Sequence, residues 1–465
     1  MTQKLSTDLY RLLCLSILFS TVCCLAPAFG QSATPLDDQG EDWTTVSLTQ
    51  AGVKSEPIAG MLMAIKRGVY KNIHCVLLVR GGRLCLEEYF QGYDRDKMHE
   101  IRSAMKSIGS VLVGIAKDKN YLSDLEEPIW HYFKDRTVNW DNRSRAVTIQ
   151  NLLTMTSGFA CDDHGGEPFQ CERGMYKADD WVNFALHLPM AHRPGDHWAY
   201  NSASLILLSE IIRQKTGLPV LLFAEEHLMA PLGITDIRWG FSPKGRIWLA
   251  GNASMRPRDM AKLGQMCLNK GLWQNRRIVS EKWLAESTRF HVHTEYGMEY
   301  GYLWWRGHQT INDQQIEAYW AQGNGGQVIF ICPFLDLVAV FTGGNYNSIH
   351  EFQFMGILIN HVLPAMLPPV PEKTFISPGK QALMTLSGKY SCHRLQLHIF
   401  HKKDKLVGQL AGEKVPIFFE DNDHFFIPNP IFGNMNGTIV RDLDGTPAEL
   451  LINSAFSKLR FKKIG

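Results

Sequence analysis

The chain has 465 residues, of which 45% are hydrophobic and 11% aromatic, and its 48 basic and 46 acidic residues give a formal net charge of +2. This size and composition predict a globular protein large enough for two domains. Because no basic stripe or charged tail stands out, nucleic acid is not expected as a partner.

The first 30 residues are typical of a signal peptide. Lys4 and Arg11 make the N-terminal region basic, and residues 12–25 are almost wholly apolar. Ala28 and Gly30 then provide small residues at the two positions that signal peptidase recognises. The apolar run is too short to span a bilayer comfortably, and the match to a lipobox is poor. We expect export, to the periplasm or as a secreted protein, with lipoprotein anchoring less favoured. No stable membrane span is expected after cleavage, because no later run reaches about 18 apolar residues.

Residues 31–56 form a polar, irregular N-terminal lead, and the first regular elements follow it. The apolar spacing predicts a helix around residues 58–66. Apolar and β-branched residues then predict a hairpin over residues 75–89 that turns at Gly81-Gly82. With that turn, Leu78 rather than Cys75 faces Cys85.

Residues 103–116 read SAMKSIGSVLVGIA, which predicts a helix buried on most of its circumference. Lys106 is its only ionisable residue, and a lysine is rarely buried without a partner or a task. Ser103 lies three residues earlier, on the same helix face. Since desolvation favours the neutral amine, Lys106 can accept the proton of the Ser103 hydroxyl. A second Ser-x-x-Lys match, Ser377 to Lys380, lies in a Pro/Gly-rich stretch that cannot hold a helix.

The later elements suggest an α+β catalytic domain over residues 57–367. Helices are predicted at 148–155, 205–216 and 257–269, and strands at 301–306, 317–322, 327–332 and 337–342. Early and late strands with helices between them indicate an antiparallel sheet closed by both ends of the domain, with a helical insert. Residues 368–384 read as a linker, and residues 385–465 as a small all-β domain with strands such as 395–400, 424–427 and 450–452.

Removal of the signal peptide leaves seven of the ten cysteines, so at least one is free or pairs between chains. Cys161 and Cys171 flank a loop rich in Gly, Pro and Asp and are the favoured disulfide pair. In this loop, Asp162-Asp163-His164 is expected to be solvated, or to border a cleft. No C-x-x-C spacing points to a zinc or redox site, and neither a metal nor a cofactor is expected.

Two further segments are candidates for a site with Ser103. Tyr200 lies in a Pro-Gly loop that leads into the helix at 205–216, where a phenol can relay protons; an ordinary half-buried tyrosine is the alternative. Gly323-Asn324-Gly325-Gly326 links two predicted strands and can present backbone amides to an oxyanion; a plain hairpin turn is the alternative.

These segments resemble the serine β-lactamase and penicillin-binding-protein superfamily, in particular its class C-related branch and the 6-aminohexanoate-dimer (nylon-oligomer) hydrolases. The resemblance runs in order from Trp43 to Leu363, and three motifs with ordered spacing are far more specific than one. The stretches that carry it are 99–107 (HEIRSAMKS), 152–158 (LLTMTSG), 257–264 (PRDMAKLG), 301–305 (GYLWW) and 323–327 (GNGGQ). It implies a β-lactamase/transpeptidase-like fold of antiparallel sheet and flanking helices, and a C-terminal domain like the small barrel-like one of some members.

The resemblance also implies roles. Ser103 would be the acylated nucleophile and Lys106 its base, and Tyr200 would share protons with Lys106 and protonate the leaving group. The oxyanion hole would use the backbone amide of Ser103 and that of Asn324 or Gly325.

Two departures bear on the substrate. Ser202 stands where the family often has asparagine in Tyr-x-Asn, and it offers a substrate one hydroxyl donor instead of an amide. The third motif lacks the lysine or histidine that penicillin-recognising members carry before the glycine, here Gly323, although another cation such as Arg306 can serve. The implied function is an exported serine hydrolase of small-molecule or peptide amides or esters. The alternatives are a D,D-peptidase, transpeptidase or β-lactamase, and a non-catalytic protein that binds wall fragments.

Overall fold

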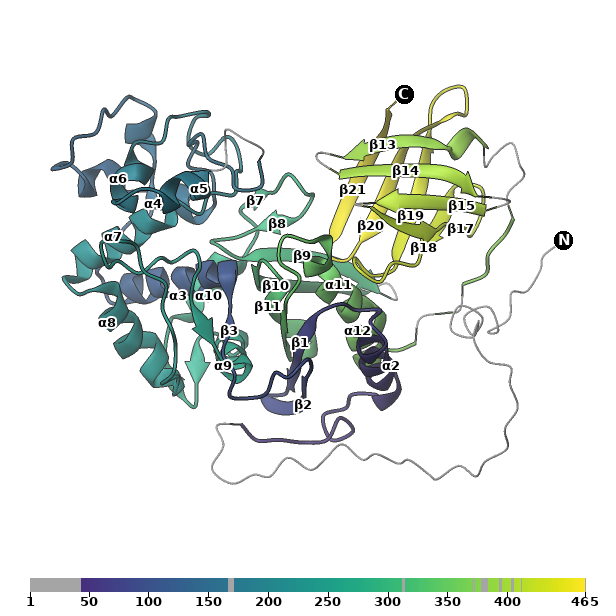
Figure 1. Ribbon diagram of the computed structural model, residues 1–465, viewed down its shortest axis with the longest axis horizontal. Coiled ribbons are helices and arrows are strands. Elements are labelled where there is room, and N and C mark those ends of the chain that lie inside the picture. Colours follow the sequence, from purple (N-terminus) through teal and green to yellow (C-terminus); the bar gives the residue numbers. More distant parts are fainter. Residues whose placement is uncertain are drawn as a thin grey trace.

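The computed structural model describes residues 43–165, 171–311, 314–369, 371, 373–377, 384–392, 395–402, 405–410 and 412–464. Within these ranges the chain forms a helix-flanked eight-stranded antiparallel sheet and a nine-stranded antiparallel sheet built from its C-terminal part (Figure 1). The expected signal peptide lies outside the described residues. No helix in the described ranges has the length and apolar character needed to cross a membrane.

The first sheet has the strand order β2-β1-β12-β11-β10-β9-β8-β7, so the earliest strands pair beside the last one. This confirms a sheet closed by both ends of the domain. Its central strands are buried along nearly their whole length, because helices cover both faces. The strands are β1 (Ile73–Arg80), β2 (Arg83–Tyr89), β7 (Val292–His293), β8 (Glu299–Tyr300), β9 (Trp305–Ile311), β10 (Gln314–Gly323), β11 (Gln327–Cys332) and β12 (Leu337–Gly343).

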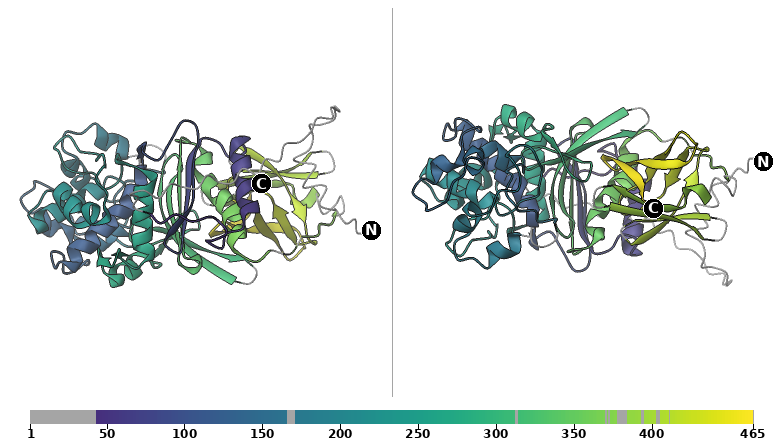
Figure 2. Two further views of the ribbon diagram at one scale, coloured as in Figure 1. Left: turned by 90° about the horizontal axis from the view of Figure 1, so that it is seen from below. Right: turned by 90° about the horizontal axis from the view of Figure 1, so that it is seen from above.

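Helices form a layer on each side of this sheet (Figure 2). One layer contains α2 (Ser55–Lys66), α11 (Gln353–Ile357) and α12 (Leu363–Met366). The other, larger layer contains the helices between β2 and β7. They are α3 (Met105–Asp118), α4 (Ile149–Leu153), α5 (Cys171–Tyr176), α6 (Trp181–Leu186), α7 (Leu205–Thr216), α8 (Val220–Ala224), α9 (Pro257–Leu268) and α10 (Glu281–Thr288).

Short elements connect these layers. A one-turn helix η1 (Arg102–Ala104) precedes α3, and the two-residue strands β3 (His99–Glu100) and β4 (Ser254–Met255) pair with each other. Strands β5 (Leu272–Trp273) and β6 (Arg276–Arg277) form a small hairpin after α9.

Two local expectations were wrong. Residues 301–306 were expected to form a strand, but residues 301–304 turn between β8 and β9, and Leu303 has a φ of 62°. Tyr302, Leu303 and Trp304 are nonetheless buried, and an apolar run does not separate a buried turn from a buried strand. In the first hairpin a bulge shifts the register, so Leu78 pairs with Leu86.

The C-terminal sheet has the order β16-β15-β14-β13-β21-β20-β19-β18-β17 and encloses its own apolar core. Its strands alternate buried and outward-facing residues, which gives an all-β, nearly closed barrel. They are β13 (Gly388–Cys392), β14 (Leu395–Lys402), β15 (Lys405–Leu410), β16 (Glu413–Pro416), β17 (Phe418–Phe419), β18 (His424–Ile427), β19 (Met435–Arg441), β20 (Pro447–Ser454) and β21 (Ser457–Ile464).

Candidate active site

Ser103 lies in η1, at the point where the chain turns into the buried helix α3. The preceding residue, Arg102, has a φ of 51°, a conformation that is uncommon outside glycine and clusters at functional sites. Lys106, in the first turn of α3, places its Nζ 2.9 Å from the Ser103 Oγ. The i, i+3 spacing in the sequence thus becomes a direct hydrogen bond between the two side chains.

The Lys106 side chain is buried in spite of its charge, with 1% of its surface exposed. Its Nζ also donates to the carbonyl oxygen of Ala250 at 3.1 Å and lies 4.7 Å from the centre of the Tyr200 ring. Burial lowers the pKa of Lys106 to about 8, although the charges of Glu172 and Asp163 oppose this shift. The neutral amine is therefore accessible near neutral pH, as a general base requires.

Tyr200 reaches the same place from the loop before α7 and is buried at 5% exposure. Its ring stacks on His164, with centroids 4.4 Å apart, and lies 5.9 Å from the ring of Trp305. Burial raises the pKa of Tyr200, and the hydrogen bond with the Ser103 side chain opposes this shift. The phenol consequently holds its proton at neutral pH; its hydroxyl is hydrogen-bonded to Ser103, and its ring lies over the Lys106 amine.

Asp163 connects Ser202 and Tyr200 to the loop between the two cysteines. Its carboxylate accepts the Ser202 amide at 2.7 Å, and its own amide donates to the Tyr200 carbonyl oxygen at 2.8 Å. Burial and the nearby charge of Glu172 raise the pKa of Asp163 to about 6. Of the two expectations for Asp162-Asp163-His164, a solvated loop or one that borders a cleft, the structure confirms the second, because Asp163 and His164 both line a cleft and His164 packs against Tyr200.

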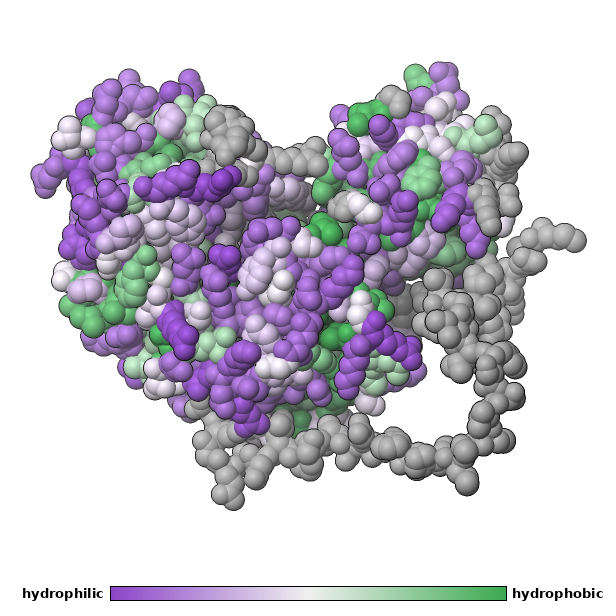
Figure 3. Space-filling model, in the orientation of Figure 1, coloured by the Kyte–Doolittle hydropathy of each residue, from purple (hydrophilic) through white to green (hydrophobic). Residues whose placement is uncertain are grey.

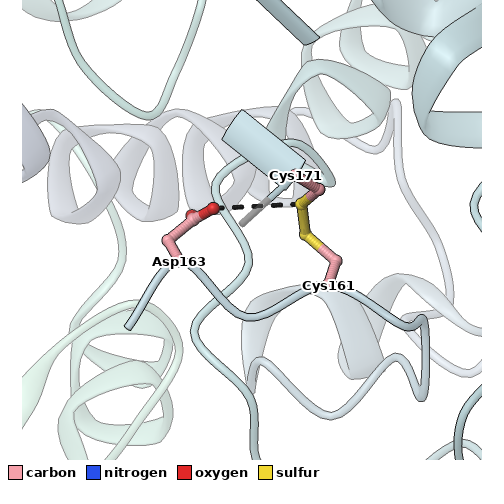
Figure 4. A group of neighbouring side chains, drawn as sticks. All are labelled: Cys161, Asp163 and Cys171. Atoms are coloured by element: carbon pink, nitrogen blue, oxygen red, sulfur yellow. Dashed lines mark hydrogen bonds between the residues drawn. A yellow bond between two sulfur atoms is a disulfide. The ribbon is translucent and has the colours of Figure 1, made fainter. Parts of the chain in front are cut away.

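Cys161 and Cys171 form a disulfide that closes this loop (Figure 4). Asp163 lies beside the bridge, with its Oδ1 3.8 Å from the Cys171 sulfur. Among the described residues, these three side chains are the one cluster with metal-ligand character. Both sulfurs are already bonded to each other, so the cluster does not offer the thiolates that a soft metal requires.

The glycine-rich segment lies against the nucleophile from the end of β10. A Cβ built on Gly323 would lie 2.2 Å from the Ile101 carbonyl oxygen and 3.0 Å from the Ser103 nitrogen, so only glycine allows this approach. Asn324 follows directly, and its side chain exchanges two hydrogen bonds of 2.8 Å with Asn347. The strand end that carries Gly323 and Asn324 therefore lies directly against the backbone of Ser103.

Glu351, which the sequence analysis did not single out, lies behind this segment. Its carboxylate accepts the Gly325 amide at 3.2 Å. Burial raises the pKa of Glu351 to about 7, and the hydrogen bond from Gly325 opposes the shift. Only a long-range contact brings Glu351 to the site, so no motif in the sequence signals it.

The site opens into a cavity of about 580 Å³ between the helical layer and the C-terminal sheet, where the surface is hollowed in Figure 3. Ser103, Tyr200, Ser202, Gly323 and Asn324 all line this cleft. Two arginines, at positions 102 and 173, line it as well. Arg306 instead pairs with Glu299 at 3.2 Å and Glu317 at 3.4 Å and is not part of the lining.

Residues 50–351 match the Beta-lactamase family. By sequence the chain is 25% identical over 290 residues to a 6-aminohexanoate-dimer hydrolase of Paenarthrobacter ureafaciens, a match that covers 57% of this chain and 70% of that relative.

Two solved structures are similar in fold. The octameric penicillin-binding protein homologue from Pyrococcus abyssi has a TM-score of 0.53 at 16% identity and covers 88% of this chain and 99% of its own. A penicillin-binding protein homologue from Caulobacter crescentus has a TM-score of 0.54 at 14% identity and covers 68% of this chain and 99% of its own. Because the matched region spans more than half of the sequence and contains Ser103, Lys106 and Tyr200, the chain belongs to the Beta-lactamase family and has the fold of the serine β-lactamases and penicillin-binding proteins.

Proposed function

We propose that this protein is a serine hydrolase that cleaves amide or ester bonds through an acyl-enzyme on Ser103. The observation that carries the proposal is the 2.9 Å contact between the Ser103 Oγ and the buried Lys106 Nζ. Serine acyl-enzyme chemistry is general for the family to which the chain belongs. The similarity to a 6-aminohexanoate-dimer hydrolase supports amides among the substrates.

In the proposed acylation step, neutral Lys106 accepts the Ser103 proton while the Oγ attacks the carbonyl carbon. Negative charge develops on the carbonyl oxygen, where the backbone amides of Ser103 and Asn324 would stabilise it. We choose Asn324 over Gly325 because the Gly325 amide already donates to Glu351. Tyr200 passes a proton from Lys106 to the departing amine or alcohol. In the second step, water gives a proton to the Lys106–Tyr200 pair as it attacks the acyl carbon. The bond from that carbon to the Ser103 Oγ then breaks, the pair returns the proton to the Oγ, and the acid leaves.

Ser202 and Gly323 are proposed to contact the substrate, since both line the cleft beside Ser103. The runner-up function is a D,D-peptidase, transpeptidase or β-lactamase. Arg102 and Arg173 in the cleft favour this alternative, because either can bind a substrate carboxylate in place of the missing cation before Gly323. A binding protein without catalysis is disfavoured, because it has no need of a lysine with a lowered pKa beside a serine.

Labelling with a fluorophosphonate tests the nucleophile. Intact-mass spectrometry should show one adduct on the wild-type protein and on Ser377→Ala, the matched change at the second Ser-x-x-Lys sequence, and none on Ser103→Ala. Turnover of p-nitrophenyl esters and linear amide oligomers should disappear with Ser103→Ala. Labelling that survives Ser103→Ala would overturn the assignment. Turnover of D-Ala-D-Ala peptides or nitrocefin, without turnover of the amide oligomers, would favour the runner-up.

We also propose that the protein is exported, on the basis of the basic start and apolar run in residues 1–30. Fractionation of the producing cells, followed by N-terminal sequencing, should find the protein outside the cytoplasm and starting near Gln31. A cytoplasmic protein that retains its first residues would contradict this.

A further inference from the structure

One wall of the cleft is supplied by the C-terminal sheet rather than by the domain that carries Ser103. Most of the side chains that this sheet contributes are apolar. The residues from this part of the chain that line the cleft include Leu395, Leu410, Phe432, Met435, Ser457 and Leu459.

These side chains gather at one end of the sheet because of its strand pairing. β14 begins where β15 ends, since Leu397 pairs with Leu410. β19 begins where β20 ends, and β20 ends where β21 begins, with Ser454 opposite Ser457. Leu410, Met435 and Leu459 also belong to the apolar core of this sheet. The cleft is therefore continuous from Ser103 to the mouth of the near-barrel.

Contacts between the domains hold this wall in place. Phe456, at the turn between β20 and β21, is 2% exposed and packs 5.3 Å from Phe330 and 5.7 Å from Trp320 of the first sheet. The Gly356 amide donates to the Ile431 carbonyl oxygen at 3.0 Å. A wall anchored in this way can act as part of a binding site, because it does not have to be ordered when the substrate binds.

The catalytic domain faces this wall with apolar side chains of its own, among them Met298, Trp305, Phe352 and Met355. The lining also contains the carboxyl groups of Asp163, Glu172 and Glu351. A cavity of about 580 Å³ with this character suits an apolar group joined to a reactive polar centre.

We propose that the mouth of the C-terminal near-barrel is the specificity pocket of the enzyme and binds an unbranched apolar chain attached to the scissile carbonyl or to its leaving group. The substrate class is then esters or amides that carry an aliphatic chain. This inference rests on the proposed function, since it takes Ser103 as the reacting centre. Burial of each added methylene is expected to raise kcat/KM by up to about fourfold until the pocket is full.

Two ester series test the proposal. In one, p-nitrophenyl esters carry acyl chains from acetyl to decanoyl; in the other, acetate esters carry alcohols of increasing length. In the wild type, kcat/KM should rise with chain length in one series, which identifies the side of the bond that enters the pocket. A flat profile in both series would overturn the proposal.

Variants locate the pocket. Leu395→Gln, at a partly exposed position, should reduce the ratio of long-chain to short-chain kcat/KM about tenfold. Ser457→Phe fills the same end and should move the optimum to shorter chains. Leu443→Gln, at a fully exposed position in the turn at the other end of the sheet, is the matched control and should leave the ratio unchanged. The pocket assignment would be contradicted if Leu395→Gln and Ser457→Phe kept the wild-type ratio of long-chain to short-chain kcat/KM while their melting temperatures were unchanged.

A binding measurement separates this inference from the proposed function. Ser103→Ala should bind a dansylated undecanoate, and adding Leu395→Gln should weaken that binding at least fivefold. If Ser103→Ala does not bind the probe, the pocket is not a chain-binding site. If it binds the probe but the wild type hydrolyses no ester or amide, the proposed function fails while the pocket stands.

Discussion

Lys106 illustrates what burial does to a single residue. Its amine is enclosed by α3, the carbonyl of Ala250 and the ring of Tyr200, and its pKa falls to about 8. A lysine in water would be protonated almost completely at neutral pH and could not act as a base. The same desolvation that costs stability therefore supplies the base.

The pH dependence of the reaction should report this group. Because Lys106 must be neutral in the free enzyme, kcat/KM should rise about tenfold per pH unit below its pKa and level off above about pH 8. In Lys106→Arg the positive charge is kept, but the guanidinium cannot lose its proton and so cannot act as a base. Activity should therefore fall by about 1,000-fold or more, because Ser103 is no longer activated. Circular dichroism controls for folding. A profile with no inflection between pH 6 and 9 would contradict the role of Lys106.

At the scale of elements, the end of β10 sets the geometry of the nucleophile. Gly323 allows the strand to touch the backbone of Ile101 and Ser103. Gly323→Ala would place a methyl group 2.2 Å from the Ile101 oxygen, so the strand end must move away and the Asn324 amide with it. We expect kcat to fall about 100-fold, the scale of one lost oxyanion donor.

The control for this substitution is Gly60→Ala in α2. A Cβ there meets nothing closer than the His361 ring at 3.8 Å. This change should leave activity intact and stabilise the fold by about 0.5–1 kcal/mol, because alanine is the better helix former. Full activity of Gly323→Ala would show that the oxyanion hole lies elsewhere.

The loop between α4 and α5 depends on its disulfide. The bridge closes a separation of 10 residues, and Asp163 inside the loop holds Ser202 and the carbonyl of Tyr200. The double substitution of both cysteines by serine should lower the free energy of unfolding by up to about 3 kcal/mol and reduce kcat, because Tyr200 loses part of its support. Reduction of the wild type with dithiothreitol should reproduce both effects in urea melts and assays. An unchanged kcat would assign the bridge to stability alone.

At the scale of the whole molecule, the two sheets are joined through Phe456. The Phe456 ring is buried among residues of the first sheet, although Phe456 belongs to the second sheet. Its carbonyl oxygen also approaches the first sheet closely, because a Cβ built on Gly307 would lie only 2.2 Å from it. The two sheets therefore share one apolar contact region.

Phe456→Ala should cost about 3–5 kcal/mol, the usual cost of removing a buried phenylalanine. It should also loosen the wall of the cleft, so hydrolysis of long-chain esters should fall more than that of acetates. Leu443→Ala, at a fully exposed turn, should change stability by less than about 0.5 kcal/mol. Calorimetry measures both variants. Equal stability of the two would mean that the sheets are not coupled.

The sequence alone determined the features that depend on neighbours along the chain. The α7 boundaries, the strand at 327–332 and the turn at Gly81-Gly82 follow from short-range patterns, and the structure confirms each. Ser103 and Lys106 could be paired because three residues on a helix fix their separation. The order and spacing of the motifs then predicted the family, which the family match over residues 50–351 confirms.

Only the tertiary structure decided which distant groups surround that pair. The residues concerned come from separate segments of the chain: Asp163, Glu351 and the apolar wall around Leu395. Packing of side chains between the layers brings these segments together at the site. Leu303 shows the same limit, since burial at a turn and burial in a strand select similar residues. Local patterns encode helices, strands and turns, whereas the shape of a cleft is set by long-range contacts that leave no periodic trace in the sequence.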